Sequence, residues 1–116
     1  MEDIIQKIEG HARYGPALRQ ALESGGTLVL NYHSHGPVGP EGYCVSICER
    51  RQGDSPRQLM GLEVGLEELV HIRGFGRSQD DCLPQCAALG DLLARHYQLD
   101  QPPEIFFQGK PYPTVN

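Results

Sequence analysis

The sequence lacks several features that would identify a class of function. It contains no Trp, three Phe and five Tyr, so few aromatic rings are present on which nucleic-acid bases could stack. Its formal net charge is −5, whereas binding to a phosphate backbone requires an excess of positive charge. No apolar run approaches the roughly 20 residues that span a bilayer, and the first ten residues, MEDIIQKIEG, do not resemble a signal peptide. We therefore expect a soluble, cytoplasmic protein with no nucleic-acid partner and no membrane association.

Cysteine is present, but not at the spacing of a structural zinc site. The four cysteines form two Cys-x3-Cys pairs, Cys44/Cys48 and Cys82/Cys86. Structural zinc sites typically use Cys-x2-Cys, and a chain without a secretion signal favours reduced thiols over disulfides. We expect Cys82 and Cys86 to be small core residues, with a reactive Cys82 at a helix N-terminus as the minor alternative.

The length of 116 residues suits a single domain, 1–116, with an irregular tail over 109–116. Helical spacing of apolar residues predicts a helical segment over 3–23, interrupted at Gly15-Pro16, and a second helix at about 81–98. For the second helix the predicted N-cap is Asp80 or Asp81, with Pro84 in the first turn.

Strand patterns lie between and after these helices. A long loop over 36–42, with two Gly-Pro steps, connects the first two strands into a hairpin, and 59–75 is either two strands or includes a helical turn. The predicted fold class is α+β, with a mostly antiparallel sheet of four to five strands and the helices packed on one face. The predicted strands are residues 27–34, 43–50, 59–65, 69–75 and 104–108.

Alternation along the hairpin assigns side chains to faces. Burying the apolar set Leu28, Leu30 and Tyr32 beside Val45 and Ile47 turns the alternate residues away from the helices. We expect that second face to contact a ligand, another subunit or a protein partner, which makes a homo-oligomer the expected assembly. Because Cys82 and Cys86 face the sheet from the other side, a four-cysteine zinc site is not expected. The residues predicted to share the second face are Asn31, His33, His35, Cys44, Ser46 and Cys48.

His33 and His35 carry the candidate chemistry. Two imidazoles could bind zinc or another transition metal if Cys44 or Glu41 supplied a third ligand. Alternatively, one histidine could act as a general acid or base beneath the 36–42 loop. Because no third ligand has a diagnostic spacing, we expect no cofactor and keep the metal as the alternative.

A weaker candidate site involves anions. The segment GFGRS, residues 74–78, leads into a helix N-terminus, where Arg77 could contact an anion with help from His71 and Arg73. Asp80 and Asp81 already place negative charge in the first turn, which favours a plain strand-to-helix connection.

Residues 76–108 resemble the second half of tautomerase-superfamily subunits, because GRS precedes an amphipathic helix and an apolar strand. That family carries its chemistry on an amino-terminal proline at the start of a strand. This chain begins Met1-Glu2-Asp3 and continues into a predicted helix, so the resemblance transfers no catalytic residue.

Taken together, the residues favour a small binding or interaction module that uses the sheet face and loop around residues 31–44. The alternative is a small enzyme in which His33 and His35 act as acid-base groups or metal ligands. We favour the first, because no nucleophile–base pair or complete ligand set can be assembled from spacing alone.

Overall fold

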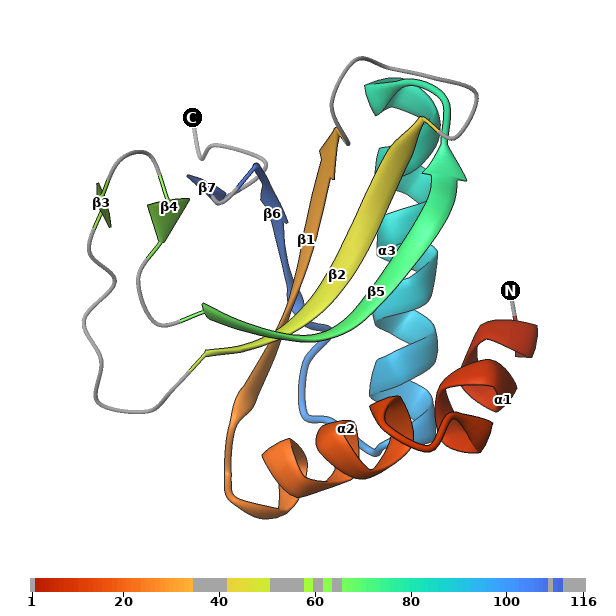
Figure 1. The fold of residues 1–116 in the computed structure, drawn as a ribbon, viewed down its shortest axis with the longest axis vertical. Helices are drawn as coiled ribbons and strands as arrows, with labels where there is room; N and C mark the ends of the chain where they lie inside the picture. Colours follow the sequence, from red (N-terminus) through yellow and green to blue (C-terminus); the bar gives the residue numbers. More distant parts are fainter. Residues whose placement is uncertain are drawn as a thin grey trace.

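The computed structural model describes residues 2–34, 42–50, 58–59, 62–63, 66–108 and 110–111, and they form an α+β domain as predicted (Figure 1). None of the helices in these ranges is long and apolar enough to cross a membrane. The helices are α1 (Glu2–Gly10), α2 (Tyr14–Glu23) and α3 (Gln79–His96), and the strands are β1 (Thr27–Ser34), β2 (Tyr43–Arg50), β3 (Gln58–Leu59), β4 (Leu62–Glu63), β5 (Leu66–Gly76), β6 (Glu104–Phe107) and β7 (Lys110–Pro111).

The main sheet is mixed rather than wholly antiparallel. Its strand order is β5-β2-β1-β6-β7. The β1–β2, β2–β5 and β6–β7 pairs are antiparallel, whereas β6 runs parallel to β1. The parallel pair arises because α3 carries the chain from β5, at one edge, across the sheet to the far side of β1. The alternation of side chains within a strand does not indicate such a crossover, so it could not predict the parallel pair.

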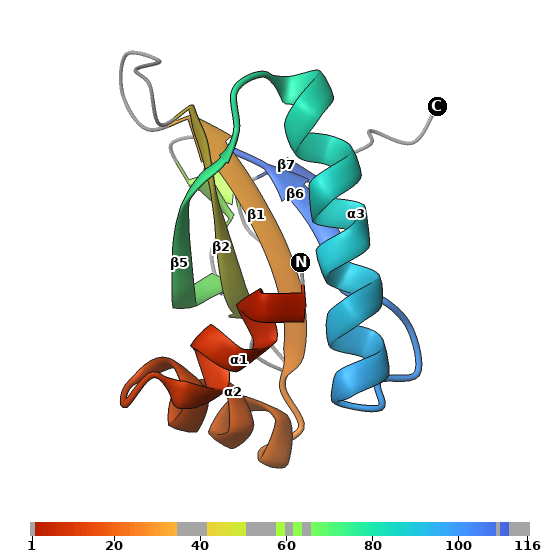
Figure 2. The same ribbon diagram turned by 90° about the vertical axis from the view of Figure 1, so that its right-hand side faces the viewer.

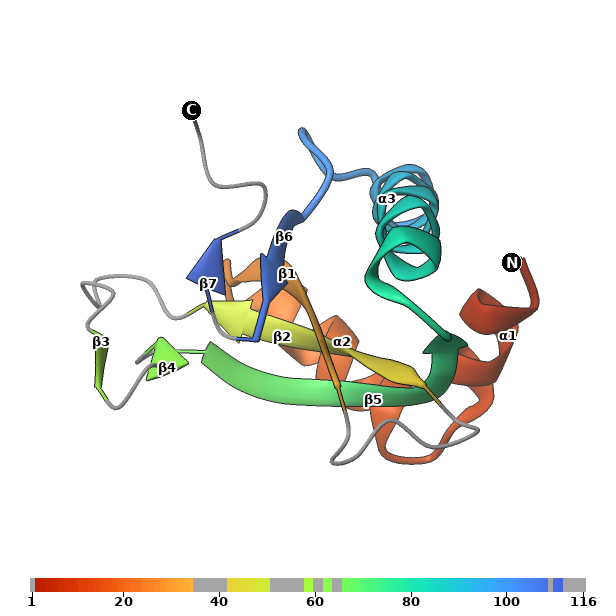
Figure 3. The ribbon, with the colours of Figure 1, turned by 90° about the horizontal axis from the view of Figure 1, so that it is seen from above.

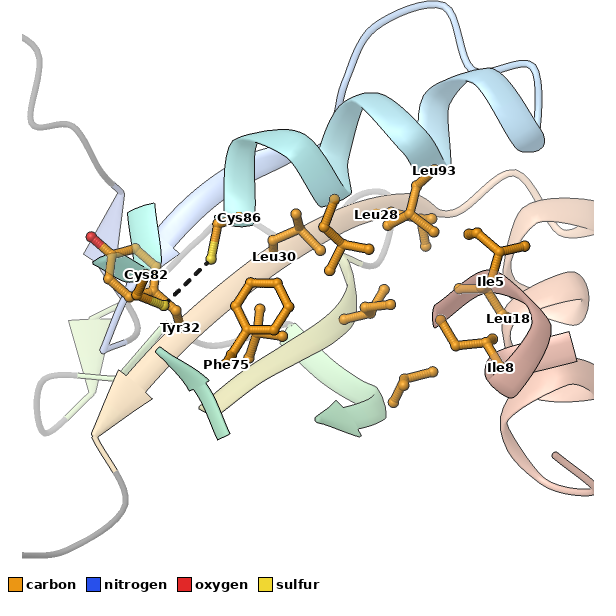
Figure 4. Packing of buried hydrophobic residues seen from close by; sticks show 14 residues of the cluster. Ile5, Ile8, Leu18, Leu28, Leu30, Tyr32, Phe75, Cys82, Cys86 and Leu93 are labelled. Atoms are coloured by element: carbon orange, nitrogen blue, oxygen red, sulfur yellow. Dashed lines mark hydrogen bonds between the residues drawn. The ribbon is translucent and has the colours of Figure 1, made fainter. Parts of the chain in front are cut away.

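All three helices contribute to one hydrophobic core on the same side of the sheet. Figures 2 and 3 show α3 lying across that face, and Figure 2 shows α1 and α2 at one end of the sheet. Leu30, Tyr32 and Ile47 project from the sheet into this core, and Leu89 and Leu93 of α3 cover them. Figure 4 shows this packing, with α1 and α2 contributing Ile5, Ile8 and Leu18.

Two helix boundaries differ from the predicted ones. The first helical region breaks at residues 11–13, because His11 Nδ1 accepts hydrogen bonds from the backbone N–H groups of Arg13 (3.1 Å) and Tyr14 (3.2 Å). Pro16 then lies inside the first turn of α2. The N-cap of α3 is Ser78, not Asp80 or Asp81, since the Ser78 hydroxyl accepts from the backbone N–H of Asp81 at 3.2 Å.

Three strand predictions also change. Of the strand predicted over 59–65, the described residues Leu59, Leu62 and Glu63 lie outside the main sheet, because β3 and β4 pair with each other in a separate two-stranded sheet. Residues 66–76 form a single strand, without a helical turn. The tail is not irregular throughout, because Lys110–Pro111 pairs with β6.

His35, Glu41 and most of the 36–42 loop lie outside the described residues.

Candidate metal-binding site on the outer face of the sheet

The β1–β2 register confirms the predicted division of the hairpin into two faces. Leu30 pairs with Ile47 on the core side, whereas Asn31 pairs with Ser46 and His33 with Cys44 on the other side. We call this second side, which points away from α3, the outer face. From β1, β2, β5 and β6 it presents Val29, Asn31, His33, Cys44, Ser46, Cys48, Glu68, His71 and Phe106.

A bulge in β5 brings two further polar residues to this face. Residues three apart on a regular strand point to opposite faces, because side chains alternate. Glu68, however, pairs with Cys48, and His71 pairs with Ser46, so β5 has one residue more than β2 across this interval. The extra residue restores the same side for Glu68 and His71, as bulges generally do when they re-aim a side chain.

Four polar side chains meet at the centre of the outer face, and we call them the polar cluster: His33, Ser46, Glu68 and His71. The Ser46 hydroxyl lies 3.2 Å from His33 Nε2 and 3.3 Å from His71 Nδ1. It also donates a hydrogen bond to Glu68 Oε2, which lies 3.5 Å from His71 Nδ1. The imidazole rings of His33 and His71 are 5.6 Å apart between centroids. Three strands therefore direct their polar groups to one point.

Burial differs sharply within the polar cluster. Ser46 is only 1% exposed, whereas the side chain of His71 is 23% exposed and that of Glu68 is 54% exposed. Ser46 therefore anchors the polar cluster from inside the sheet. Glu68 and His71 leave it open to solvent along β5.

The hydrogen-bond partners define the proton positions. Since the Ser46 hydroxyl donates its one hydrogen to Glu68, its lone pairs accept from the two imidazoles. The proton of His33 then lies on Nε2 and that of His71 on Nδ1, an assignment that follows from the partners. A change of tautomer would move each proton to the other ring nitrogen, and His33 Nε2 and His71 Nδ1 would then each present a lone pair to the centre of the polar cluster.

The donor set fits a transition-metal ion. One ligand atom from each of His33, Glu68 and His71 lies within 4.8 Å of the other two. Two imidazoles and a carboxylate suit zinc and related divalent ions, whose tetrahedral ligands stand about 3.3 Å apart when bonds are about 2.0–2.1 Å long. The distance of 3.5 Å between Glu68 Oε2 and His71 Nδ1 is already close to that separation. A comparable separation of the His33 ligand atom from the other two would complete a three-ligand site.

The predicted site residues are partly brought together. His33 and Ser46 belong to the polar cluster, while Asn31 lies beside it on β1, opposite Ser46. Cys44 is buried on the same face, but its sulfur is not part of the ligand group found among the described residues. Of the predicted anion residues, His71 joins the polar cluster, whereas Arg73 and Arg77 are exposed.

Glu68 is the functional candidate that sequence reasoning missed. Regular alternation from His71 would have assigned it to the opposite face of the strand. The bulge in β5 could not be predicted, because nothing in the sequence GLEELVHI marks where an extra residue interrupts the regular pairing.

Beside the polar cluster, β1, β2 and β6 each contribute a buried apolar residue to the outer face. Val29, Cys48 and Phe106 form a second, small hydrophobic cluster, and the Arg50 guanidinium lies 5.1 Å from the centroid of the Phe106 ring. Burial, together with the nearby Glu68 carboxylate, raises the pKa of Cys48 to about 12. The Cys48 thiol therefore stays protonated at neutral pH and is a poor nucleophile or ligand there.

The two cysteine pairs lie on opposite sides of the sheet, as predicted. Cys82 and Cys86 are fully buried in the main core, where their sulfurs stand 3.8 Å apart (Figure 4). Their mutual hydrogen bond lowers the pKa of Cys82 and raises that of Cys86.

No protein-family model, curated protein or solved structure matches this chain.

Proposed function

We propose that this protein is a small binding module whose ligand is a divalent transition-metal ion, held on the outer face by His33, Glu68 and His71. The observation that carries the proposal is the convergence of these three donors, from β1 and β5, within 4.8 Å of one another. Two imidazoles beside one carboxylate recur in metal sites because neutral nitrogen and anionic oxygen donors together satisfy a borderline-soft cation.

The polar cluster supports an open site rather than a closed one. Structural zinc sites usually have four protein ligands, whereas three protein ligands leave a position for water or an added ligand. Ser46 Oγ lies 3.2 Å from His33 Nε2 and 3.3 Å from His71 Nδ1, and both distances are close to the ligand–ligand distance in a tetrahedral zinc site. A neutral hydroxyl is a weak ligand, so it orients the site more than it holds the ion.

The fold supports binding without refolding. The main core lies on the opposite side of the sheet and includes Leu18, Leu30 and Leu89. We therefore expect a chelator to remove the ion while the helices and sheet remain intact.

Calorimetric titration with Zn²⁺ of the protein freed of metal by a chelator tests the proposal. We expect one ion per chain, and at a free Zn²⁺ concentration 100 times Kd the unfolding free energy should rise by about 2.7 kcal/mol. His33→Ala, Glu68→Gln and His71→Ala should each weaken binding at least about tenfold, because each removes one of three ligands.

The matched control is His96→Ala, which removes an exposed imidazole on α3 and should leave Zn²⁺ affinity unchanged. Retention of wild-type affinity by all three cluster variants would refute the proposal. So would a titration of the wild-type protein that shows no stoichiometric binding.

The predicted contact with another copy through this face is a separate proposal, and light scattering on the same samples tests it. The acid-base alternative also uses His33. It predicts an activity that survives exhaustive chelation, whereas metal binding predicts a stoichiometric ion in the protein.

A further inference from the structure

A cavity of about 260 Å³ lies between α1 and β5. Its apolar lining comes from Ile4 and Ile8 of α1 and from Val70 and Ile72 of β5. Ile8 and Val70 belong to the buried core, so the floor of the cavity is fixed by the packing of the domain. The volume lies just below the roughly 300–1,000 Å³ of pockets that hold drug-sized ligands, which suits a smaller molecule.

Two basic side chains stand beside this apolar floor. Lys7 and Arg73 line the cavity and are exposed, one from each of the two elements. Among the described lining residues every charged side chain is basic, although the chain as a whole has a net charge of −5. The two basic residues in the lining favour an anionic ligand.

Histidine and tyrosine form one wall. The ring of His11 stacks on that of Tyr14, with centroids 4.0 Å apart, and both line the cavity. Because His11 Nδ1 accepts two backbone hydrogen bonds, Nε2 carries the proton and is a donor. These hydrogen bonds orient the His11 ring at the start of α2.

We propose that this cavity binds a small organic carboxylate, with an aliphatic tail on the isoleucine and valine floor and the carboxylate between Lys7 and Arg73. The combination of a small apolar floor with two cations at the rim matches a short amphiphilic acid in size, polarity and charge. The inference goes beyond the metal site and does not require it, although His71 contributes to both.

The test is a titration of the ¹⁵N-labelled protein with hexanoate, followed by amide chemical shifts. We expect saturable shifts at residues 4–14 and 70–73. Affinity should rise by up to about fourfold for each methylene from acetate to butyrate to hexanoate, because each CH₂ is moved from water to the apolar floor. Hexanol, which has the tail without the charge, should bind at least about tenfold more weakly than hexanoate.

Variants at the rim test the role of charge. Lys7→Gln and Arg73→Gln should each weaken hexanoate binding by about tenfold, since each removes a charge-assisted contact with the carboxylate. Arg95→Gln is the matched control, because it neutralises an exposed cation in the last turn of α3 and should leave the affinity unchanged. Well-dispersed amide spectra of the three variants verify that they fold.

Equal binding of hexanol and hexanoate would overturn the inference, as would unchanged affinity in both rim variants. His33→Ala separates the two proposals. It should weaken Zn²⁺ binding at least about tenfold but leave hexanoate binding saturable, so failure at one site is distinguishable from failure at the other.

Discussion

Ser46 is the residue on which the geometry of the polar cluster depends. Its hydroxyl contacts His33, Glu68 and His71, and its near-complete burial fixes the point at which they meet. A buried hydroxyl with donor and acceptor capacity both satisfied orients its neighbours without adding charge.

Replacing this hydroxyl by a thiol should convert an orienting group into a ligand. We expect Ser46→Cys to raise Zn²⁺ affinity at least about tenfold, because thiolate is a strong zinc ligand and the site would then have four protein donors. The Co²⁺-loaded variant should also gain a thiolate charge-transfer band in the near ultraviolet. Ser46→Ala is the control and should show no such band; a Ser46→Cys variant without the band would place this atom outside the coordination sphere.

The sequence predicts the position of some residues of the outer face but not of others. Strand alternation correctly places Asn31, His33 and Ser46 on one face, because the burial of an apolar face determines the hairpin register. It could not place Glu68, since that residue reaches the same face only through an irregularity in β5.

Among the elements, α3 is well predicted in its buried stripe and wrongly predicted at its start. Cys82, Cys86, Leu89 and Leu93 are buried as the helical spacing indicates. Ser78 caps the helix because its extended backbone conformation, φ −139° and ψ 166°, aims the hydroxyl at the Asp81 N–H. Asp80 and Asp81 instead occupy the first turn, where their charge complements the helix dipole.

Removing this cap should destabilise the domain. We expect Ser78→Ala to lower the free energy of unfolding by about 1 kcal/mol, because one backbone N–H at the helix start loses its acceptor. Urea denaturation provides the measurement, and Ser78→Asp, which retains an acceptor, should remain close to wild type. An unchanged midpoint for Ser78→Ala would show that the hydroxyl is dispensable.

At the scale of the whole molecule, one set of side chains joins all three helices. Glu9 of α1 accepts a hydrogen bond from the Tyr97 hydroxyl at the end of α3 and from Arg19 Nε of α2, the latter at 2.9 Å. The Tyr97 hydrogen bond and the Arg19 guanidinium hold the pKa of Glu9 below its ordinary value of 4.5. No pattern in the sequence pairs these residues, since Glu9 and Tyr97 are 88 positions apart.

The lowered pKa predicts a pH dependence of stability with a definite sign. A carboxylate whose pKa is depressed in the folded state stabilises the fold above its unfolded pKa, and the contribution is lost as the pH falls through the folded pKa. We expect Glu9→Gln to reduce the free energy of unfolding by about 1 kcal/mol at pH 7. The difference from wild type should shrink steadily as the pH is lowered from about 4.5.

Urea denaturation of both proteins from pH 7 to pH 3 measures that difference. Asp91→Asn, at an exposed position on α3, is the control and should follow the wild-type profile. A Glu9→Gln deficit that persists unchanged at pH 3 would mean that the carboxylate charge is not its cause.

The irregular pairing of β5 has one more consequence for the whole molecule. β5 lies at one edge of the five-stranded sheet, and a long regular edge strand is a template for pairing with other chains. Its register with β2 shifts between Tyr43 and Val45 and again between Ile47 and Cys48. Each shift displaces the backbone donors and acceptors from even spacing, so an incoming strand cannot form a continuous ladder. The irregularity that assembles the polar cluster therefore also makes β5 a poor template for edge-to-edge pairing.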